Sequence, residues 1–273
     1  MNAQNTMAGK ETFESPAFSD RLKSMLKLDF YRLFHAPNFY IMLLIAAIIP
    51  AMIVGTSGLE TQGAGTGNPA NSAAPAASIE IVNVWQLVES AGGSAAANPL
   101  DFGGYANINM LFIFAGLLMA IFVAHDYSSG FVKNIFTVHA KKMDYVISKS
   151  MVGVFGGAGM IITYVLGTAI AGLLTGKAFD VNVGGLIMCL ASKMLLMGVF
   201  CSLFLCIAVF FRNKLWLTIV FTFLFGMMLY PAASVATLNS TAVTVFIALI
   251  AGIIGAATFG AVSSVILKKR DLV

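Results

Sequence analysis

Charged residues are scarce in this sequence. They make up 10% of its 273 residues, whereas hydrophobic residues make up 59%. A soluble domain needs a mostly polar surface, so this composition excludes a soluble globular protein and is typical of a chain that lies in a bilayer. Segments of about ten residues with alternating polarity are also missing, which excludes a membrane β-barrel.

Long apolar runs are abundant in place of the missing charges. A helix needs about 20 mostly apolar residues to cross roughly 30 Å of hydrocarbon. Runs of about this length or more cover residues 39–55, 108–124, 151–174, 183–211, 215–236 and 242–267. The sequence therefore predicts an all-α polytopic membrane protein with six transmembrane helices, which together form a transmembrane domain over residues 37–273.

Positive charge is absent from the connection between the first two runs, residues 56–107. Lys and Arg gather instead before the first run, after the second, after the fourth and after the sixth; only Lys177 departs from this alternation. Because basic short loops stay in the cytoplasm, both termini are expected there and residues 56–107 outside. The net charge of +4 then reflects topology and attraction to lipid headgroups, and no nucleic-acid partner is expected.

The outer connection is acidic and begins with a stretch rich in Gly, Ala, Ser, Asn and Pro. Such a composition offers little apolar surface for folding. We expect a small extracellular loop domain over residues 56–107. Two interpretations remain open for it, a lid over an outward opening and a passive linker.

Metal-binding, redox and nucleotide-binding motifs are missing too. Cys189, Cys201 and Cys206 have spacings that match neither a metal site nor a CxxC redox pair, and no HExxH motif is present. Lys177 follows a glycine, but the GxxxxGK[ST] pattern that binds nucleotide phosphates is not there. We therefore expect no catalytic residue, no metal site, no cofactor and no ATP hydrolysis in this chain.

The N-terminal segment carries an amphipathic pattern. Residues 1–17 are expected to be a disordered leader. From residue 18 to 36, Leu22, Leu26 and Phe30 recur at helical spacing between basic residues, which predicts an interfacial helix in the inner headgroup layer. The alternative is a cytosolic helix that packs on another protein.

A polar island, residues 125–149, separates the second and third apolar runs and is expected in the cytoplasm. Asp126 is expected to pair with a cation, for which the nearby candidates in the sequence are Lys133, Lys141 and Lys142. Gly130 permits a sharp bend, and apolar residues at helical spacing then predict a short amphipathic helix on the inner surface. A partner protein could bind such a helix. The alternative is a plain loop that only connects the two membrane spans.

Taken together, these features resemble the type 2 ABC exporter permeases. The resemblance rests on the leader helix, the six runs, the large first outer loop and the exit of the second run, "AHDYSSGFVKNIFTVHAKKMDYVISK". The residues that match the family pattern are Asp126, Gly130, Lys133, Asn134, Tyr145 and Lys149. Size and outer loop look most like bacterial peptide-toxin or antimicrobial-peptide exporter permeases, such as the phenol-soluble modulin exporter and the bacitracin and lantibiotic immunity permeases.

The resemblance implies a transport subunit in the bacterial cytoplasmic membrane, driven by a separate ABC ATPase subunit in two copies that bind ATP and magnesium. A second permease chain, identical or similar, would complete the membrane domain. The ATPase-coupling residues would be Asp126, Gly130, Phe131, Lys133, Asn134 and Ile135. The substrate would be a hydrophobic or amphipathic peptide that is moved by alternating access. Membrane lipids would be further partners of the protein.

Two residues are candidates for the substrate path, Lys193 and Tyr230. Charge inside an apolar run is costly, so Lys193 is either functional or reaches the outer headgroups with its ammonium. Export of lipids or other hydrophobic small molecules is the alternative function. A secondary transporter or a membrane scaffold is a further one, although no Asp or Glu lies inside the six runs.

Overall fold

Helices form nearly all the regular structure in the computed structural model, which describes residues 17–63, 83–88, 107–137, 141–212 and 214–269. The elements are α1 (Phe18–His35), α2 (Pro37–Gly63), the short 3-10 helix η1 (Val84–Leu87), α4 (Met110–Ser128), α5 (Phe131–Thr137), α6 (Lys142–Thr175), α7 (Val183–Phe211), α8 (Leu215–Ala233) and α9 (Ala242–Lys269). Within the described residues the only β pairing is an isolated bridge from Asn83 to Ala178. The all-α prediction is confirmed.

Five helices of the described part are long and apolar enough to cross a membrane. They are α2, α4, α6, α7 and α9. The apolar part of α8, Leu215–Leu229, is shorter and spans only about 22 Å as a helix, against roughly 30 Å of hydrocarbon. The chain is a multi-pass membrane protein, and the structure counts five of the six predicted spans.

One helix boundary differs from the prediction at the start of the outer connection. α2 continues through residues 56–63, which the sequence assigned to the loop, because Leu59, Glu60 and Gln62 are all compatible with a helix. Of the remainder, residues 64–82 and 89–106 lie outside the described residues. The predicted disordered leader does so as well, apart from residue 17.

The helix predicted over residues 18–36 is observed as α1, Phe18–His35. α2 begins immediately after it at Pro37, whose ring prevents α1 from continuing and fits the first position of a helix. Met25, Asp29 and Leu33 are the buried residues of α1, one helical turn apart. One of the three is a carboxylate, so the buried stripe of α1 is not purely apolar.

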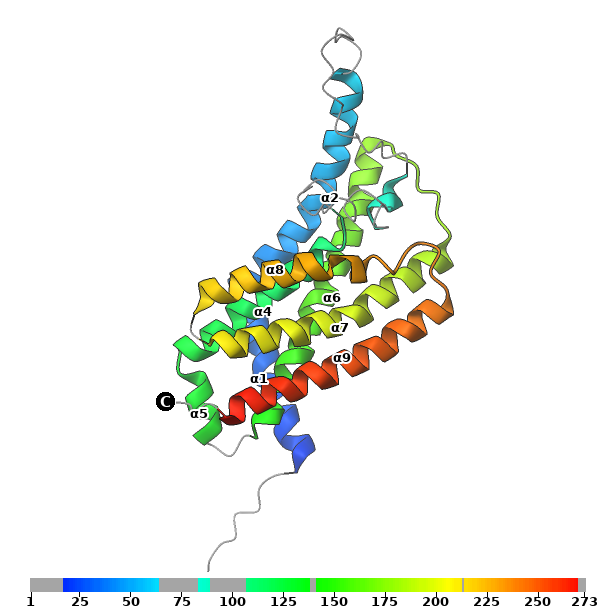
Figure 1. The fold of residues 1–273 in the computed structure, drawn as a ribbon. Helices are drawn as coiled ribbons and strands as arrows, with labels where there is room; N and C mark the ends of the chain where they lie inside the picture. Colours follow the sequence, from blue (N-terminus) through cyan, green and yellow to red (C-terminus); the bar gives the residue numbers. More distant parts are fainter. Residues whose placement is uncertain (1–16, 64–82, 89–106, 138–140, 213, 270–273) are drawn as a thin grey trace, which may run out of the picture.

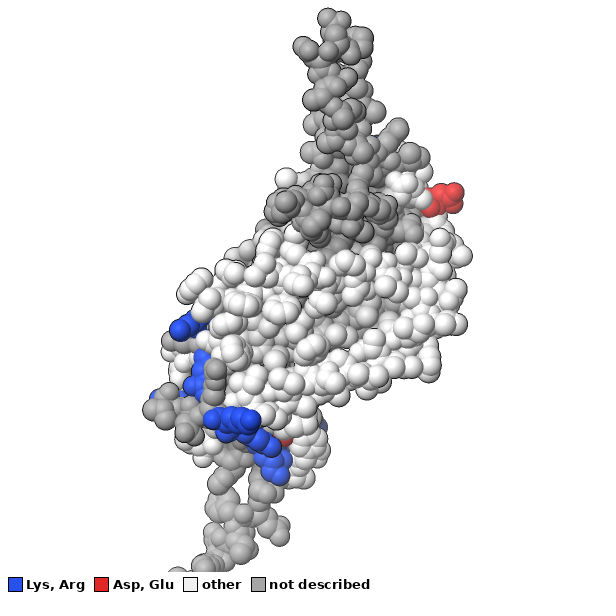
Figure 2. Space-filling view, in the orientation of Figure 1, with Lys and Arg blue, Asp and Glu red and all other residues white. Residues whose placement is uncertain are grey.

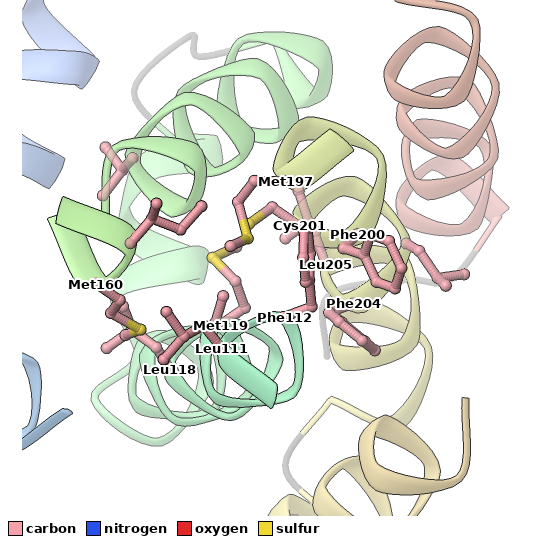
Figure 3. Packing of buried hydrophobic residues seen from close by; sticks show 14 of the residues in the cluster. Leu111, Phe112, Leu118, Met119, Met160, Met197, Phe200, Cys201, Phe204 and Leu205 are labelled. Carbon is pink, nitrogen blue, oxygen red and sulfur yellow. The ribbon is translucent and has the colours of Figure 1, made fainter. Parts of the chain in front are cut away.

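The core lies between α4, α6 and α7, where large side chains interdigitate (Figure 3). Met119 of α4 and Met197 of α7 turn their sulfur atoms toward each other. α6 accepts them with small residues: a Cβ atom added to Gly157 would lie 2.6 Å from the Met197 side chain, and Gly153 is packed as closely against Met119. The glycines of α6 therefore serve helix packing.

Lys and Arg on the visible face gather at one end of the molecule, and the middle is uncharged (Figure 2). This basic end comprises α5, the start of α6, the turn between α7 and α8, and the C-terminal end of α9 (Figure 1). It carries Lys133, Lys142, Arg212, Lys214 and Lys268. On this face charge is thus confined to the ends of the membrane helices, as contact with lipid requires.

The far end is formed by η1, the turn between α6 and α7, and the connection between α8 and α9 (Figure 1). η1 is anchored there by its backbone: Val84 N donates to Ala178 O at 3.1 Å, and Ile108 N donates to Leu87 O at 3.3 Å. Val84 and Leu87 are buried. This fragment of the outer connection is therefore packed into the helices of the far end.

Candidate functional site

A sharp turn at Gly130 creates α5. Gly130 has φ +70°, a left-handed conformation that glycine adopts without strain. Ser129 ends α4 with its backbone N–H donating to His125 O. The bend predicted at Gly130 is confirmed, and α5 follows at once. Residues 138–140, including the end of the predicted amphipathic helix, lie outside the described residues.

The polar island is not one segment. Residues 125–128 complete α4, α5 covers Phe131–Thr137, and residues from Lys142 onward already belong to α6. Tyr145 and Lys149, which the family pattern marks, therefore lie on a long membrane helix rather than on a surface helix.

The two faces of α5 differ. Val132 is buried, and Ile135 and Phe136 pack against the core. Lys133 and Asn134 are exposed, as is Thr137. An amphipathic helix turns its apolar side to the body of its own protein, so the surface that α5 presents outward is polar.

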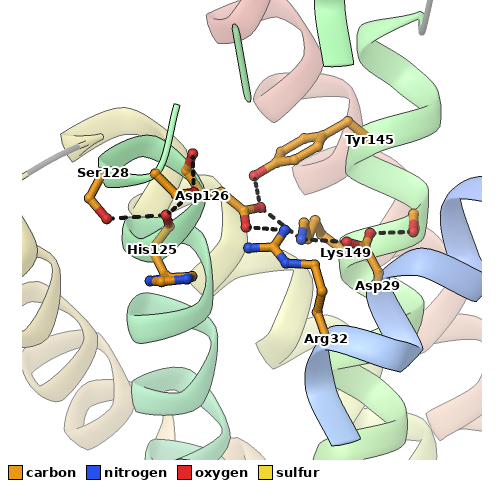
Figure 4. A network of polar contacts seen from close by, with 9 residues as sticks. Asp29, Arg32, His125, Asp126, Ser128, Tyr145 and Lys149 are labelled. Carbon is orange, nitrogen blue, oxygen red and sulfur yellow. Dashed lines mark hydrogen bonds and ion pairs between the residues drawn. The ribbon is translucent and has the colours of Figure 1, made fainter. Parts of the chain in front are cut away.

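Next to α5 lies a buried cluster of four charges, which we call the ion cluster: Asp29 and Arg32 of α1, Asp126 of α4, and Lys149 of α6 (Figure 4). Lys149 Nζ lies 2.7 Å from Asp29 Oδ1 and 2.7 Å from Asp126 Oδ2. Arg32 Nη1 lies 2.6 Å from Asp126 Oδ1. Asp29, Asp126 and Lys149 are fully buried.

Neutral side chains complete the ion cluster. Tyr145 donates its hydroxyl hydrogen to Asp126 Oδ2 at 2.9 Å, and Ser148 donates to Asp29 Oδ2 at 2.6 Å. Two carboxylates balance two cations, so the cluster has no net charge. Removing one member of such a set typically costs about 3–5 kcal/mol, because a buried charge then lacks its counter-charge.

Aromatic rings extend the ion cluster to α5. The Arg32 guanidinium lies 4.0 Å from the centre of the Phe131 ring, and Lys149 Nζ lies 4.0 Å from the centre of the Phe122 ring. Cations are attracted to ring faces, most strongly where water is excluded. The first residue of α5 is thereby joined to α1.

Two further contacts fix the start of α6. Arg21 of α1 donates to Asp144 at 2.9 Å, and Lys142 donates to Leu267 O of α9 at 2.6 Å. α1, α6 and α9 are therefore connected to one another at the basic end, next to α5.

The cations that pair with Asp126 are not the lysines close to it in the sequence. Asp126 does pair with cations, but these are Arg32 and Lys149. Lys133 and Lys141 are exposed. The nearest lysines in sequence sit on the outer side of α5 and at the turn before α6, whereas the true partners reach Asp126 from helices packed beside it.

Sequence reasoning missed Asp29 and Arg32. Asp29 lies four residues after Met25 and four before Leu33, so it falls on the apolar stripe of α1. A carboxylate at a position where the pattern calls for an apolar residue was the available signal, because buried carboxylates need a cation or hydrogen-bond donors.

The two substrate-path candidates are placed differently. Lys193 is fully buried, with Nζ donating to Asn109 Oδ1 at 2.6 Å and to Ala233 O at 3.3 Å. Its ammonium thus ends inside the protein rather than at the outer headgroups. Tyr230 lies in the last turns of α8, next to Pro231, and its side chain lies outside the described residues.

The site and most of the fold fall within a match to a known family, the ABC-2 family transporter protein, over residues 25–229. The chain belongs to the ABC-2 transporter family. No curated protein and no solved structure matches it. An ABC-2 protein is a permease-type membrane component of an ABC transporter, and its partner is an ABC ATPase subunit that typically forms a separate chain. All four members of the ion cluster lie inside the matched range.

Proposed function

We propose that this chain is the membrane subunit of an ATP-driven exporter and that α5 is its contact with the ATPase. The observation that carries the proposal is the position of α5: an exposed polar face on one side, and the ion cluster on the other. Lys133 and Asn134 offer a donor set to a partner, and Phe131 leads inward to Arg32.

The proposed coupling runs through the ion cluster. ATP-driven closure of two ATPase subunits moves the α5 of each permease chain. Phe131 and Arg32 carry that movement to α1, and the charges of Asp126 and Lys149 carry it to α4 and α6. A largely buried cluster in which each carboxylate lies within ion-pair distance of a cation suits this role, since its members have few alternative arrangements and move together.

Topology follows from charge. The basic end faces the cytoplasm because Lys and Arg are retained on that side of a bilayer, and the C-terminal end of α9 lies there. The far end, with η1, then faces outward. Six crossings are proposed, with α8 completed by residues beyond its apolar part; an even number is required to return the chain to the cytoplasmic side.

Two copies of this permease, or this one with a similar chain, would form the complete membrane domain, and a twofold dimer is the commonest arrangement among symmetric oligomers. The cargo is proposed to be a hydrophobic or amphipathic peptide, with lipids and other hydrophobic small molecules as the alternative. The apolar surfaces of the spans, rich in Phe and Met, suit a flexible amphiphile.

Affinity purification tests the proposal. A tagged chain is extracted in mild detergent, and its partners are identified by mass spectrometry. The expected result is one ABC ATPase in an amount equal to that of the permease, with ATP turnover in the purified complex. A folded, monodisperse permease that retains no ATPase under these conditions would contradict it.

A further inference from the structure

Two opposite faces of α1 differ in their chemistry. One face is buried and carries, at intervals of four residues, Met25, Asp29 and Leu33. The other face is exposed and carries a second row at the same interval, which we call the outer row: Lys23, Lys27 and Tyr31. The two rows are out of step by two residues. Two residues correspond to about 200° around a helix, so the outer row lies opposite the buried one.

Large apolar side chains are exposed on α1 beside these lysines. Tyr31 is 61% exposed, and the neighbouring Leu28 and Phe34 are each 42% exposed. The boundary between headgroups and acyl chains suits such a mixture, because rings and leucines reach the acyl chains while lysines extend their ammonium groups to the phosphates. The outer row and its neighbours therefore have the composition of a surface that contacts the membrane interface.

The end of α1 is tied to the membrane helices. One residue, Ala36, separates α1 from α2, which is long and apolar enough to cross a membrane. Tyr40, in the first turn of α2, donates its hydroxyl hydrogen to Phe34 O at 2.9 Å. The rings of Phe34 and Phe155 of α6 meet edge to face, with their centres 5.8 Å apart. α1 is thus held at the level at which the first span begins.

The exposed side of α1 has a net positive charge. Lys23 and Lys27 supply two cations, and Asp20, one turn before Lys23, supplies one carboxylate in the first turn of the helix. A carboxylate at that position stabilises the start of a helix. The cytoplasmic leaflet is negative because it contains acidic lipids, and each lysine near such a surface strengthens binding by about fivefold.

We propose that the outer row binds acidic phospholipids of the cytoplasmic leaflet, with both lysines against headgroup phosphates. α1 also carries Asp29 and Arg32, which enter the ion cluster from its other side (Figure 4). Bound lipid keeps α1 in the position from which these residues reach Asp126 and Lys149. Acidic lipid thereby supports the coupling between the ATPase and the membrane helices. This effect on coupling rests on the proposed function, whereas the binding of lipid does not.

Fluorescence quenching tests the binding directly. Tyr31→Trp is made in the full-length chain after the two native tryptophans are removed by Trp85→Phe and Trp216→Phe. The protein is placed in nanodiscs of phosphatidylcholine and phosphatidylglycerol, and each lipid is brominated in turn, because bromine quenches a tryptophan that it contacts. Brominated phosphatidylglycerol is expected to quench at about fivefold lower mole fraction than brominated phosphatidylcholine.

Charge on the outer row is then removed in a matched series. Lys23→Gln combined with Lys27→Gln should abolish the preference for phosphatidylglycerol, whereas Lys27→Arg keeps the charge and should keep the preference. Lys268→Gln combined with Lys269→Gln is the control, since it removes two exposed lysines from the end of α9 and leaves α1 unchanged.

A second measurement uses the chain with its native tryptophans and so does not depend on the folding of the tryptophan variants. Unfolding temperature is compared in nanodiscs with and without phosphatidylglycerol, and ATP turnover is measured in the complex with the ATPase. Phosphatidylglycerol is expected to raise both. Both gains should be lost in the Lys23→Gln, Lys27→Gln double variant and kept in the α9 control.

Equal quenching by the two lipids would overturn the inference. Quenching by acrylamide in the aqueous phase, with none by either lipid, would place the outer row in the cytosol and overturn it as well. Lipid quenching that disappears when the ATPase is bound would show that a protein surface covers α1 instead.

The proposed function and the lipid site fail separately. If no ATPase copurifies, the proposed function fails, but quenching still reports on the lipid site because it needs only the permease. A preference for phosphatidylglycerol combined with ATP turnover that is indifferent to this lipid would uphold the binding and overturn its effect on coupling.

Discussion

The guanidinium of Arg32 lies over the ring of Phe131, 4.0 Å from its centre. α1 and α5 meet in this contact, and the same guanidinium forms an ion pair with Asp126 of α4. Three helices therefore converge on one side chain. In the proposed coupling, a displacement of α5 would reach the membrane helices through this junction as well as through the short turn at Gly130.

The contact predicts a specific effect of Arg32→Lys. Lysine keeps the positive charge but lacks the planar group that stacks on a ring. We expect the ATPase to remain bound and the stimulation of ATP turnover by cargo to fall about fivefold, as for a loss of about 1 kcal/mol. Lys27→Arg, at an exposed position of α1, serves as the control. Full stimulation in Arg32→Lys would remove this junction from the coupling path.

The balance of charge in the ion cluster predicts a rescue. Lys149→Met leaves Asp29 and Asp126 with Arg32 as their one remaining cation in the cluster, and we expect it to lower the free energy of unfolding by about 3–5 kcal/mol. Adding Asp29→Asn restores neutrality, so the double variant should regain part of the loss.

Thermal unfolding of the purified variants measures both effects, with Lys141→Met as a matched control at an exposed lysine. Losses that simply add in the double variant would show that Asp29 and Lys149 act independently.

The two faces of α5 predict opposite outcomes for two substitutions. Lys133→Glu reverses a charge on the exposed face and should release the ATPase while changing the free energy of unfolding by less than about 0.5 kcal/mol. Ile135→Asp places a charge on the inward face and should destabilise the permease by about 2 kcal/mol. Copurification and thermal unfolding are measured together, with Lys141→Glu as control. Loss of ATPase in Lys141→Glu, with none in Lys133→Glu, would refute the assignment of faces.

The packing of η1 on α6 predicts a steric effect at Gly172. A Cβ atom there would lie 2.7 Å from Phe179 and 2.7 Å from Val84. Gly172→Ala should therefore lower the free energy of unfolding by about 1–3 kcal/mol. At Gly159 the nearest atom would be 3.7 Å away, and the same change should raise it by about 0.5 kcal/mol through the gain in helix propensity. Equal thermal shifts in the two variants would contradict the packing of η1.

Asp126 and Lys149 could be foreseen because the family pattern carries both. For Asp29 the sequence offers only one signal, a carboxylate in an apolar stripe. Its partner Lys149 could not be predicted, since it lies 120 residues away in the sequence. Phe131 and Ile135 were predicted as coupling residues. The structure places the ring of Phe131 against Arg32 and the side chain of Ile135 against the core. Of the predicted coupling residues, Lys133 and Asn134 are the exposed ones on α5, and the proposed function assigns the contact with the ATPase to them.

Helix lengths were predictable from composition, and most helices begin and end within a few residues of the apolar runs. α6 departs most: it starts at Lys142, nine residues before its apolar run. Tyr145, Ser148 and Lys149 fit into this polar first section because the carboxylates of α1 and α4 accept their hydrogen bonds. Partners of this kind are visible only once the helices are assembled.

The proposed contact of α5 with the ATPase on the cytoplasmic side can be tested by cross-linking. Asn134→Cys tests it in a chain whose native cysteines are replaced by alanine, with a thiol-to-amine cross-linker applied to inverted membrane vesicles. We expect a covalent product of the permease with the ABC ATPase. Reaction of Asn134→Cys with a membrane-impermeant maleimide added outside intact cells, without any cross-link to the ATPase, would contradict it.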